Sequence, residues 1–307
     1  MEPKLLQILR SKGGNAPEQE LLKELACTRD MLLNAMANLN GHGYKITLEN
    51  QKWELVQEPD TPFPWEFPGR QNSIHYLPVT TSTMDVARQL AKEGCPHLAV
   101  AVADRQTRGR GRMDRRWASD HGGLYFTMVL RPDLPPSDGF RFTFLASVVL
   151  ADLLKKLCRI DVGVKWPNDL ITGQGKLAGI LSEMHTTSGN IDFLNIGIGI
   201  NVNNTPTGLE TRAVSVKMLT GRKFSRTALL REFLDRFEKE LHGSNDFNDV
   251  ISRWKKLAHS LNRQVKIVTR NKIVEGFAHD VDEHGSLVVR LADGTISKVR
   301  HGDCFHV

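Results

Sequence analysis

The most informative stretch of the chain reads Asp104-Arg105-Gln106-Thr107-Arg108-Gly109-Arg110-Gly111-Arg112-Met113-Asp114-Arg115-Arg116-Trp117. From Arg105 to Arg116 it contains six arginines and a single acid, Asp114, and its two glycines alternate with arginines. Glycine lets a ligand approach the backbone closely, and the guanidinium fork matches carboxylate and phosphate oxygens. The stretch therefore predicts an anion-binding loop, with phosphate chemistry as the first hypothesis. A solvated basic surface loop or a nucleic-acid tether is the alternative that these residues leave open.

Apolar segments on both sides of this loop predict that it connects two strands. Residues 98–103 form a short apolar run that is typical of a buried strand. After the loop, Leu124, Phe126, Met128 and Leu130 alternate along the chain, which predicts a strand with one buried face. We therefore expect a rigid sheet to carry the arginine loop.

The composition is that of an ordinary globular protein. The 307 residues suffice for about two or three domains, and the net charge of +6 lies largely in the arginine loop, so charge alone does not predict a DNA-binding protein. Four dispersed cysteines without a Cys-x-x-Cys pair predict no disulfide scaffold and are consistent with a reducing cytoplasm. No window is apolar enough to predict a membrane span.

Residues 1–58 predict a winged helix-turn-helix. Three helical segments, the third capped by Thr28 with Met31 on its apolar face, precede two strands joined by residues 49–51. DNA binding through residues 18–37 is the functional interpretation. Residues 1–56 carry seven basic and seven acidic side chains, however, and a neutral module neutralises phosphates poorly. A vestigial or protein-contacting module is the alternative.

A proline-rich segment and a strand-rich end divide the remainder of the chain. Four prolines at 59, 62, 64 and 68 predict an extended, semi-rigid linker at 59–72. From residue 261 the pattern changes to four short strands, at 265–269, 273–278, 287–291 and 296–299, and predicts a small SH3-like β-barrel. His301, Cys304 and His306 lack a fourth ligand at zinc spacing, so we expect no metal site there.

Two helices are predicted early in the central domain, residues 73–260. Ser82 and Asp85 stand at capping spacing before a helix that runs through Glu93. Hydroxyls at such a helix start can bind a polar head group, although they can equally serve only as caps. A long apolar helix is predicted from Ser137 to near Cys158, and further helices over 204–260.

Three later segments, 162–170, 176–183 and 195–203, look like strands interrupted by polar residues. Lys165 lies on an apolar strand, where an ammonium is costly unless it meets an anion. A phosphate or carboxylate ligand would supply that charge; pairing with Asp161 or Asp169 is the alternative. Gly197 and Gly199 leave room for a ligand or for another backbone.

Four sequence blocks, taken together and in this order, resemble the biotin protein ligase family, in particular its bacterial type that doubles as a biotin operon repressor. They are Gln-Thr-x-Gly-Arg-Gly-Arg at 106–112, Lys-Trp-Pro-Asn-Asp-Leu at 165–170, Lys-Leu-Ala-Gly-Ile-Leu at 176–181 and Ile-Gly-Ile-Gly-Ile-Asn at 196–201. The resemblance covers nearly the whole chain. It implies an α+β protein with a winged helix-turn-helix, a class II synthetase-like catalytic domain with a mixed sheet, and the SH3-like barrel.

The resemblance also implies a reaction and its participants. Biotin and ATP, with Mg²⁺, give biotinyl-5′-AMP and pyrophosphate, and biotin then passes to a lysine of a carrier domain such as that of acetyl-CoA carboxylase. The repressor type implies operator DNA as a second partner and a homodimer. No membrane partner is expected, and no Ser-His or Cys-His nucleophile is suggested by the sequence.

Site residues follow from the resemblance one by one. Residues assigned to biotin or biotinyl-AMP are Ser82, Thr83, Met84, Gln106, Gly109, Arg110, Gly111, Arg112, Lys165 and Gly179. Residues assigned to the nucleotide are Trp117, Asn168, Lys176 and Asn201. Lys165, Arg110 and Arg112 are the catalytic assignments, and no residue is assigned to a metal.

The chain departs from the family pattern at two places. Met84 stands where asparagine is common, which replaces a polar contact by an apolar wall. Met113 and Asp114 replace a second Arg-Gly in the loop, which predicts a different closure. Mutual repulsion of the arginines predicts a loop that is mobile before ligands bind. Two rival functions stay open: a lipoate or octanoate ligase or transferase, and a nucleic-acid-binding regulator without enzyme activity.

Overall fold

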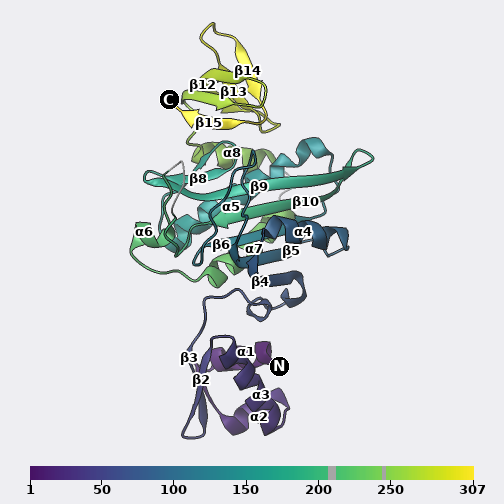
Figure 1. Cartoon of the computed structure of the whole chain (residues 1–307), viewed down its shortest axis with the longest axis vertical. Helices are drawn as coiled ribbons and strands as arrows, with labels where there is room; N and C mark the ends of the chain where they lie inside the picture. Colours follow the sequence, from purple (N-terminus) through teal and green to yellow (C-terminus); the bar gives the residue numbers. More distant parts are fainter. Residues whose placement is uncertain (207–211, 244–246) are drawn as a thin grey trace. The chain divides into compact units, whose positions relative to one another are not determined.

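The structure is a computed structural model that describes residues 1–206, 212–243 and 247–307. Within these residues the chain forms two compact units, Met1–Asn72 and Ser73–Val307 (Figure 1). Among the described residues, no helix combines the length and apolarity needed to cross a bilayer.

The first unit consists of three helices and a small antiparallel sheet. Its elements are α1 Glu2–Ser11, β1 Asn15–Pro17, α2 Glu18–Leu25, α3 Arg29–Gly41, β2 Lys45–Glu49 and β3 Lys52–Gln57, with strand order β1-β3-β2. Thr28 caps α3 by accepting a hydrogen bond from the Met31 backbone, as its sequence predicts. The prediction that Met31 faces the core is wrong, because its side chain is 48% exposed. Three-residue β1 was not predicted, since so short a strand has no alternation to read.

The proline-rich segment is folded, whereas the sequence predicted an extended spacer. It contains two single-turn 3₁₀ helices, η1 Pro64–Glu66 and η2 Gln71–Ser73. Glu66 is buried, accepts a hydrogen bond from Tyr44 and pairs with Arg10 of α1 at 2.9 Å. Burial beside this carboxylate raises the pKa of Tyr44 above its usual range. Polar side chains thus anchor a segment whose prolines alone would favour extension.

The second unit is built on a seven-stranded mixed sheet with the order β4-β5-β6-β10-β9-β8-β7 (Figure 1). The strands are β4 Ile74–Thr80, β5 Ala99–Gln106, β6 Leu124–Leu130, β7 Gly163–Lys165, β8 Asp169–Thr172, β9 Gly175–Thr187 and β10 Asn190–Ile200. Within the described part of the chain, β4 and β5 are the one parallel pair of this sheet, and its other neighbouring strands are antiparallel. The arginine loop therefore joins the neighbouring antiparallel strands β5 and β6, on the frame that its flanking segments predict.

Both faces of this sheet are covered. Helix α4, Thr83–Lys92, packs Ala87 and Ala91 against Ala99, Ala101 and Val129 on one face. On the other face, Phe126 contacts Phe233 of α7, Arg226–Gly243, with ring centroids 5.4 Å apart. The four alternating residues predicted on one face of β6 are buried, and the three residues between them are buried as well. The alternation of apolar residues along one strand does not show whether a second layer covers the other face of the sheet.

The segment predicted as one strand over 162–170 is two short strands, β7 and β8. They are joined by a turn that contains a cis peptide between Trp166 and Pro167. Trp166 is buried, and its indole donates a hydrogen bond to the carbonyl of Gly285, 3.0 Å away. The turn is thus tied to the C-terminal sheet.

The remaining described helices are η3 Pro136–Asp138, α5 Phe140–Cys158, α6 Val216–Thr220, α7 Arg226–Gly243 and α8 Phe247–Leu257. Helix α5 contacts β7, β8 and β9 of the sheet. Helix α5 packs against α7 and α8. Helices were predicted over 204–260; within that range, residues 207–211 and 244–246 lie outside the described residues.

The C-terminal part is a five-stranded antiparallel sheet with the order β14-β13-β12-β11-β15. Its strands are β11 Arg263–Val268, β12 Ile273–Val281, β13 Leu287–Arg290, β14 Ile296–Val299 and β15 Asp303–His306. The sequence predicts the first four strands and misses β15. In β15, Cys304 is buried, and His306 contacts the Ser260 hydroxyl at 3.2 Å.

Candidate active site

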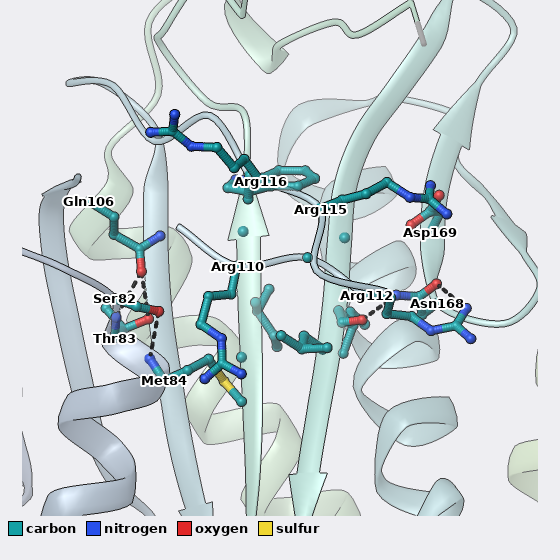
Figure 2. Close-up of a pocket in the computed structure, with 18 of the residues that line it drawn as sticks. Ser82, Thr83, Met84, Gln106, Arg110, Arg112, Arg115, Arg116, Asn168 and Asp169 are labelled. Atoms are coloured by element: carbon teal, nitrogen blue, oxygen red, sulfur yellow. Dashed lines mark hydrogen bonds between the residues drawn. The ribbon is translucent and has the colours of Figure 1, made fainter. Parts of the chain in front are cut away.

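A cavity of about 290 Å³ lies between the arginine loop and strands β8, β9 and β10. Its size is near the lower end of the range of small-molecule sites, about 300–1,000 Å³. Figure 2 shows Ser82, Thr83, Met84 and Gln106 on one side and Arg112, Asn168 and Asp169 on the other, with Arg110 between them. One end is therefore lined by hydroxyls and a thioether, and the other by charge.

The hydroxyl-lined end is the start of α4. Ser82 caps the helix by accepting a hydrogen bond from the Met84 backbone. The backbone N–H and the hydroxyl of Thr83 both donate to Oε1 of Gln106, at 2.8 and 3.1 Å. Both hydroxyls are buried, so a ligand that reaches them is shielded from water.

Glycines on the central strands make room for two large side chains. A Cβ at Gly197 would lie 2.5 Å from the Met84 sulfur, and a Cβ at Gly199 would lie 2.5 Å from Nε1 of Trp117. Gly199 and Gly179 stand opposite each other across β10 and β9, and both face the Trp117 ring. The indole therefore lies flat against a strand pair that has no side chains at this point.

Trp117 forms the wall of the second end with a lysine and an aspartate. The Lys176 ammonium lies 5.2 Å from the indole centroid and pairs with Asp169 at 2.7 Å. The indole N–H has no hydrogen-bond partner among the described residues. A flat aromatic surface next to a cation and an unused donor suits a nucleotide base or phosphate.

The cavity arginines are each held by a partner. Arg110 pairs with Glu183 at 2.6 Å and with Asp85 at 3.1 Å. Arg112 donates to the Gly302 carbonyl at 3.1 Å, and Arg115 pairs with Asp303. These contacts offset the mutual repulsion from which loop mobility was predicted.

Arg112 is the least compensated of these cations. Burial lowers the pKa of Arg112 from its ordinary value, and Arg115 adds repulsion, while Asp169 acts in the opposite direction. A half-buried guanidinium with incomplete compensation gains from an anionic ligand.

Most predicted site residues meet at this cavity. Those that line it are Ser82, Thr83, Met84, Gln106, Arg110, Gly111, Arg112, Trp117, Asn168, Lys176 and Gly179. Three others lie outside the lining: Gly109 at the base of the loop, Asn201 and Lys165. The Lys165 ammonium lies 5.8 Å from the Phe305 ring centroid. Within the described chain, Asp169 pairs with Lys176 and Asp161 with Lys155, so neither provides the alternative partner considered for Lys165.

Sequence reasoning assigned no role to several lining residues. They are Arg115, Arg116, Asp169, Ile180, Leu181, Ile198 and Asp303. Asp169 adjoins Asn168 in a block already singled out, and Gly197 and Gly199, which were expected to leave room for a ligand or another backbone, also line the cavity. No sequence signal indicated Asp303, because β15 is brought to the loop only when the chain folds.

The geometry permits a specific kind of chemistry. The cavity can hold a polar ring among hydroxyls and place an anionic tail between guanidinium and ammonium groups. Such cations stabilise the charge that builds up when a carboxylate attacks a phosphate. The cavity lining contains no cysteine or histidine that could act as a nucleophile.

Comparison with known families gives two matches. Residues 76–203 match the biotin/lipoate A/B protein ligase family, and residues 260–307 match the biotin protein ligase C-terminal domain. Bifunctional ligase/repressor BirA of Bacillus subtilis is 30% identical, over 96% of this chain and 95% of the relative. Its namesake from Escherichia coli is 33% identical, over 75% of this chain and 73% of the relative.

Solved structures agree with these matches. The biotin protein ligase of Aquifex aeolicus in complex with biotin and ATP aligns with a TM-score of 0.65 at 27% identity, over 76% of this chain and 98% of that one. The Leishmania major biotin protein ligase in complex with biotinyl-5-AMP gives 0.54 at 26% identity, over 74% and 98%. On its sequence and its fold, the chain belongs to the biotin protein ligase family.

Proposed function

We propose that this chain is an ATP-dependent biotin ligase. It makes biotinyl-5′-AMP and transfers biotin to a lysine of a carrier domain such as that of acetyl-CoA carboxylase. The observation that carries the proposal is the single cavity that joins a hydroxyl-lined end, at Ser82 and Thr83, to an arginine-lined end, at Arg110 and Arg112.

The first step follows from the charges. A biotin carboxylate oxygen attacks the α-phosphorus of ATP, a P–O bond forms, and the bond to the leaving pyrophosphate breaks. Both reactants are anions, so Arg110 and Arg112 reduce their repulsion and stabilise the five-coordinate state. In the second step the neutral amine of the acceptor lysine attacks the acyl carbon, AMP leaves, and the amine proton passes to solvent.

The nucleotide is assigned to the Trp117 side. Trp117 offers a flat face and an unused N–H, and Lys176 lies against the same ring. Asn201 is buried, and its side-chain N–H₂ also has no partner within the described residues. Unpaired buried donors are costly, and phosphate or base acceptors would satisfy them.

Lys165 remains the proposed bridge between carboxylate and phosphate. Its ammonium would have to turn from Phe305 towards the cavity when the anions arrive, since a point charge is worth more against two anions than against a ring. Gly109 is proposed to let the two ends of the arginine loop lie close together, because it has no side chain between them.

Mg²⁺ is expected to arrive with ATP. Only two carboxylates line the described cavity, Asp169 and Asp303, and each is paired with a cation. This donor set suits a magnesium ion that would be held chiefly by phosphate oxygens, and Asp169, on the nucleotide side, is the carboxylate that could add a protein ligand. Bound magnesium would neutralise phosphate charge.

We propose that residues 1–58 form a winged helix-turn-helix, that the catalytic part is class II synthetase-like and that the C-terminal sheet closes as an SH3-like barrel. The alignment with the Bacillus relative leaves out about 4% of this chain, far fewer residues than the first unit contains. A repressor role, a homodimer and a cytoplasmic location go with this proposal, and residues 18–37 of α2 and α3 are the proposed operator-binding part.

The repressor role needs its own test because the first unit is nearly neutral. The exposed face of α3 carries Asn34, which can hydrogen-bond an adenine edge, but Arg29 is paired with Glu18 at 2.8 Å. A gel-shift assay on DNA upstream of biotin genes should show a complex that requires biotin and ATP. If the protein shifts no such DNA even at low salt, the proposed repressor role is wrong.

The ligase activity is tested by pyrophosphate release and by labelling of a carrier domain. Lys165→Ala should lower biotin-dependent pyrophosphate release by about a hundredfold or more, because it removes a cation from the transition state. Lys155→Ala, an exposed lysine paired with Asp161, is the matched control and should be unchanged. Equal rates for Lys165→Ala and the parent would remove Lys165 from the mechanism.

Arg112 is tested by where the biotin goes. Arg112→Gly should still form adenylate but release it, so that labelled biotin appears on bystander proteins. Arg108→Gly alters an exposed arginine of the same loop outside this cavity and should label only the carrier. Octanoate or lipoate supporting pyrophosphate release in place of biotin would favour the lipoate alternative, and no release at all would favour a regulator.

A further inference from the structure

A continuous chain of hydrogen bonds runs from the hydroxyl-lined end of the cavity to the base of the arginine loop. Thr127 donates to the Thr83 hydroxyl at 2.8 Å, and Thr83 donates to Oε1 of Gln106 at 3.1 Å. Nε2 of Gln106 donates to the Ser119 hydroxyl at 2.8 Å, and Ser119 donates to the Trp117 carbonyl at 3.0 Å. Five residues from β5, β6, α4 and the loop are thus connected.

The orientation of Gln106 in this chain is determined. The backbone N–H of Thr83 can only donate, so the amide oxygen of Gln106 must face Thr83. Its N–H₂ therefore faces Ser119, whose hydroxyl accepts this bond and directs its own hydrogen to Trp117. Each middle hydroxyl accepts one bond and donates one, an arrangement in which successive bonds strengthen one another.

The loop base that receives this chain is tight. The backbone N–H of Trp117 donates to the Gly109 carbonyl at 2.9 Å, and the backbone N–H of Gln106 donates to the Ser119 carbonyl at 3.1 Å. A Cβ at Gly109 would overlap both the Ser119 hydroxyl and the Trp117 carbonyl. The two ends of the loop therefore cannot move apart without breaking the bonds of Ser119.

Among the described residues, the side chains of Ser119 and Thr127 make no hydrogen bond outside this chain of bonds. Both side chains are buried, at 4% and 0% exposure, and neither lines the cavity. Each reaches a ligand only through Thr83 or Gln106.

We propose that Ser119 and Thr127 are positioning residues that couple the ring-binding end of the cavity to the arginine loop. A biotin ring at Thr83 fixes Gln106, and Gln106 holds the loop base from which Arg110 and Arg112 extend. Biotin alone then orders the loop before any phosphate is present. This inference rests on the proposed function, because it takes biotin as the ligand at Thr83.

Trypsin gives a direct test on the full chain, because it cleaves after arginine. In the parent protein, saturating biotin without ATP should slow cleavage within residues 105–116 by about tenfold. In Ser119→Ala and Thr127→Val this protection should fall below about twofold, although equilibrium dialysis shows that labelled biotin is bound. Because biotin is saturating, the degree of protection measures the coupling between the biotin site and the loop and not the affinity for biotin.

Matched controls remove equally buried hydroxyls elsewhere. Thr143→Val deletes a buried hydroxyl of α5 that has no partner among the described residues. Ser147→Ala deletes one that bonds only within α5, to the Phe144 carbonyl. Both variants should keep the protection of the parent, which separates coupling from a general loss of stability.

Two outcomes overturn the inference. The first is full protection by biotin in Ser119→Ala and Thr127→Val. The second is a parent protein that binds biotin without any protection. A parent that binds no biotin would instead overturn the proposed function, so the two failures are distinguishable.

Discussion

At the scale of single residues, the cavity depends as much on missing side chains as on charged ones. Gly179 and Gly199 face each other on adjacent strands, and the Trp117 indole occupies the space above them. The arginines could be predicted from their density, and the hydroxyls of α4 from capping spacing. The strand pair against which Trp117 lies could not be predicted, because the pairing register of two strands cannot be read from either segment alone.

Gly199 gives a prediction at this scale. Gly199→Ala should displace Trp117, since the new Cβ would lie 2.5 Å from its Nε1, and raise KM for ATP by about tenfold or more while KM for biotin changes little. Steady-state pyrophosphate release with each substrate varied is the measurement. Gly173→Ala, where a Cβ has no neighbour within 4 Å, is the control. Equal KM values for ATP in both variants would refute the Trp117 assignment.

At the scale of elements, β15 shows what sequence patterns miss. It has four residues and pairs with β11, yet it brings Asp303 to the cavity and Phe305 to Lys165. Long helices such as α5 and α7 were predictable from their period of apolar residues. Short strands were not, because four residues give too little alternation and their partners lie elsewhere in the chain.

His306 of β15 makes folding sensitive to acid. Arg263 donates to its Nδ1, so the neutral ring must carry its proton on Nε2, facing Ser260. Burial, with nearby Lys165 and Arg263, lowers the pKa of His306 from 6.5 to about 4. Between these values the unfolded chain binds a proton that the folded chain excludes.

The free energy of unfolding should therefore fall as the pH drops from 6.5 towards 4. The expected loss is about 1–2 kcal/mol, after allowing for partial exposure of the ring. Urea unfolding at pH 7 and pH 4.5 measures it, and His306→Gln should reduce the difference because glutamine does not titrate. His301→Gln, at an exposed position, should leave it unchanged. If His306→Gln loses as much stability between pH 7 and pH 4.5 as the parent protein, the pH effect comes from other groups.

At the scale of the whole molecule, the chain has two units, and the proline-rich segment folds with the first. Sequence predicted a linker there, because four prolines favour extension. It could not predict that Glu66 would find Arg10 and Tyr44, since these residues lie 56 and 22 positions away.

This anchoring is testable by comparing two partners of Arg10. Glu66→Gln should lower the stability of the first unit by about 1–3 kcal/mol, because Glu66 is buried and holds both Arg10 and Tyr44. Glu58→Gln alters an exposed partner and should cost about 0.5 kcal/mol or less. Urea unfolding followed by tryptophan fluorescence compares them, and equal losses would contradict the anchoring role.

The C-terminal part of the chain supplies Gly302 and Asp303 to Arg112 and Arg115, which lie 190 and 188 residues earlier. Translation must therefore nearly finish before the cavity has its last wall. We expect a chain stalled on the ribosome, which lacks these contacts, to make no reactive mixed anhydride, so unfinished copies would be harmless to neighbouring lysines.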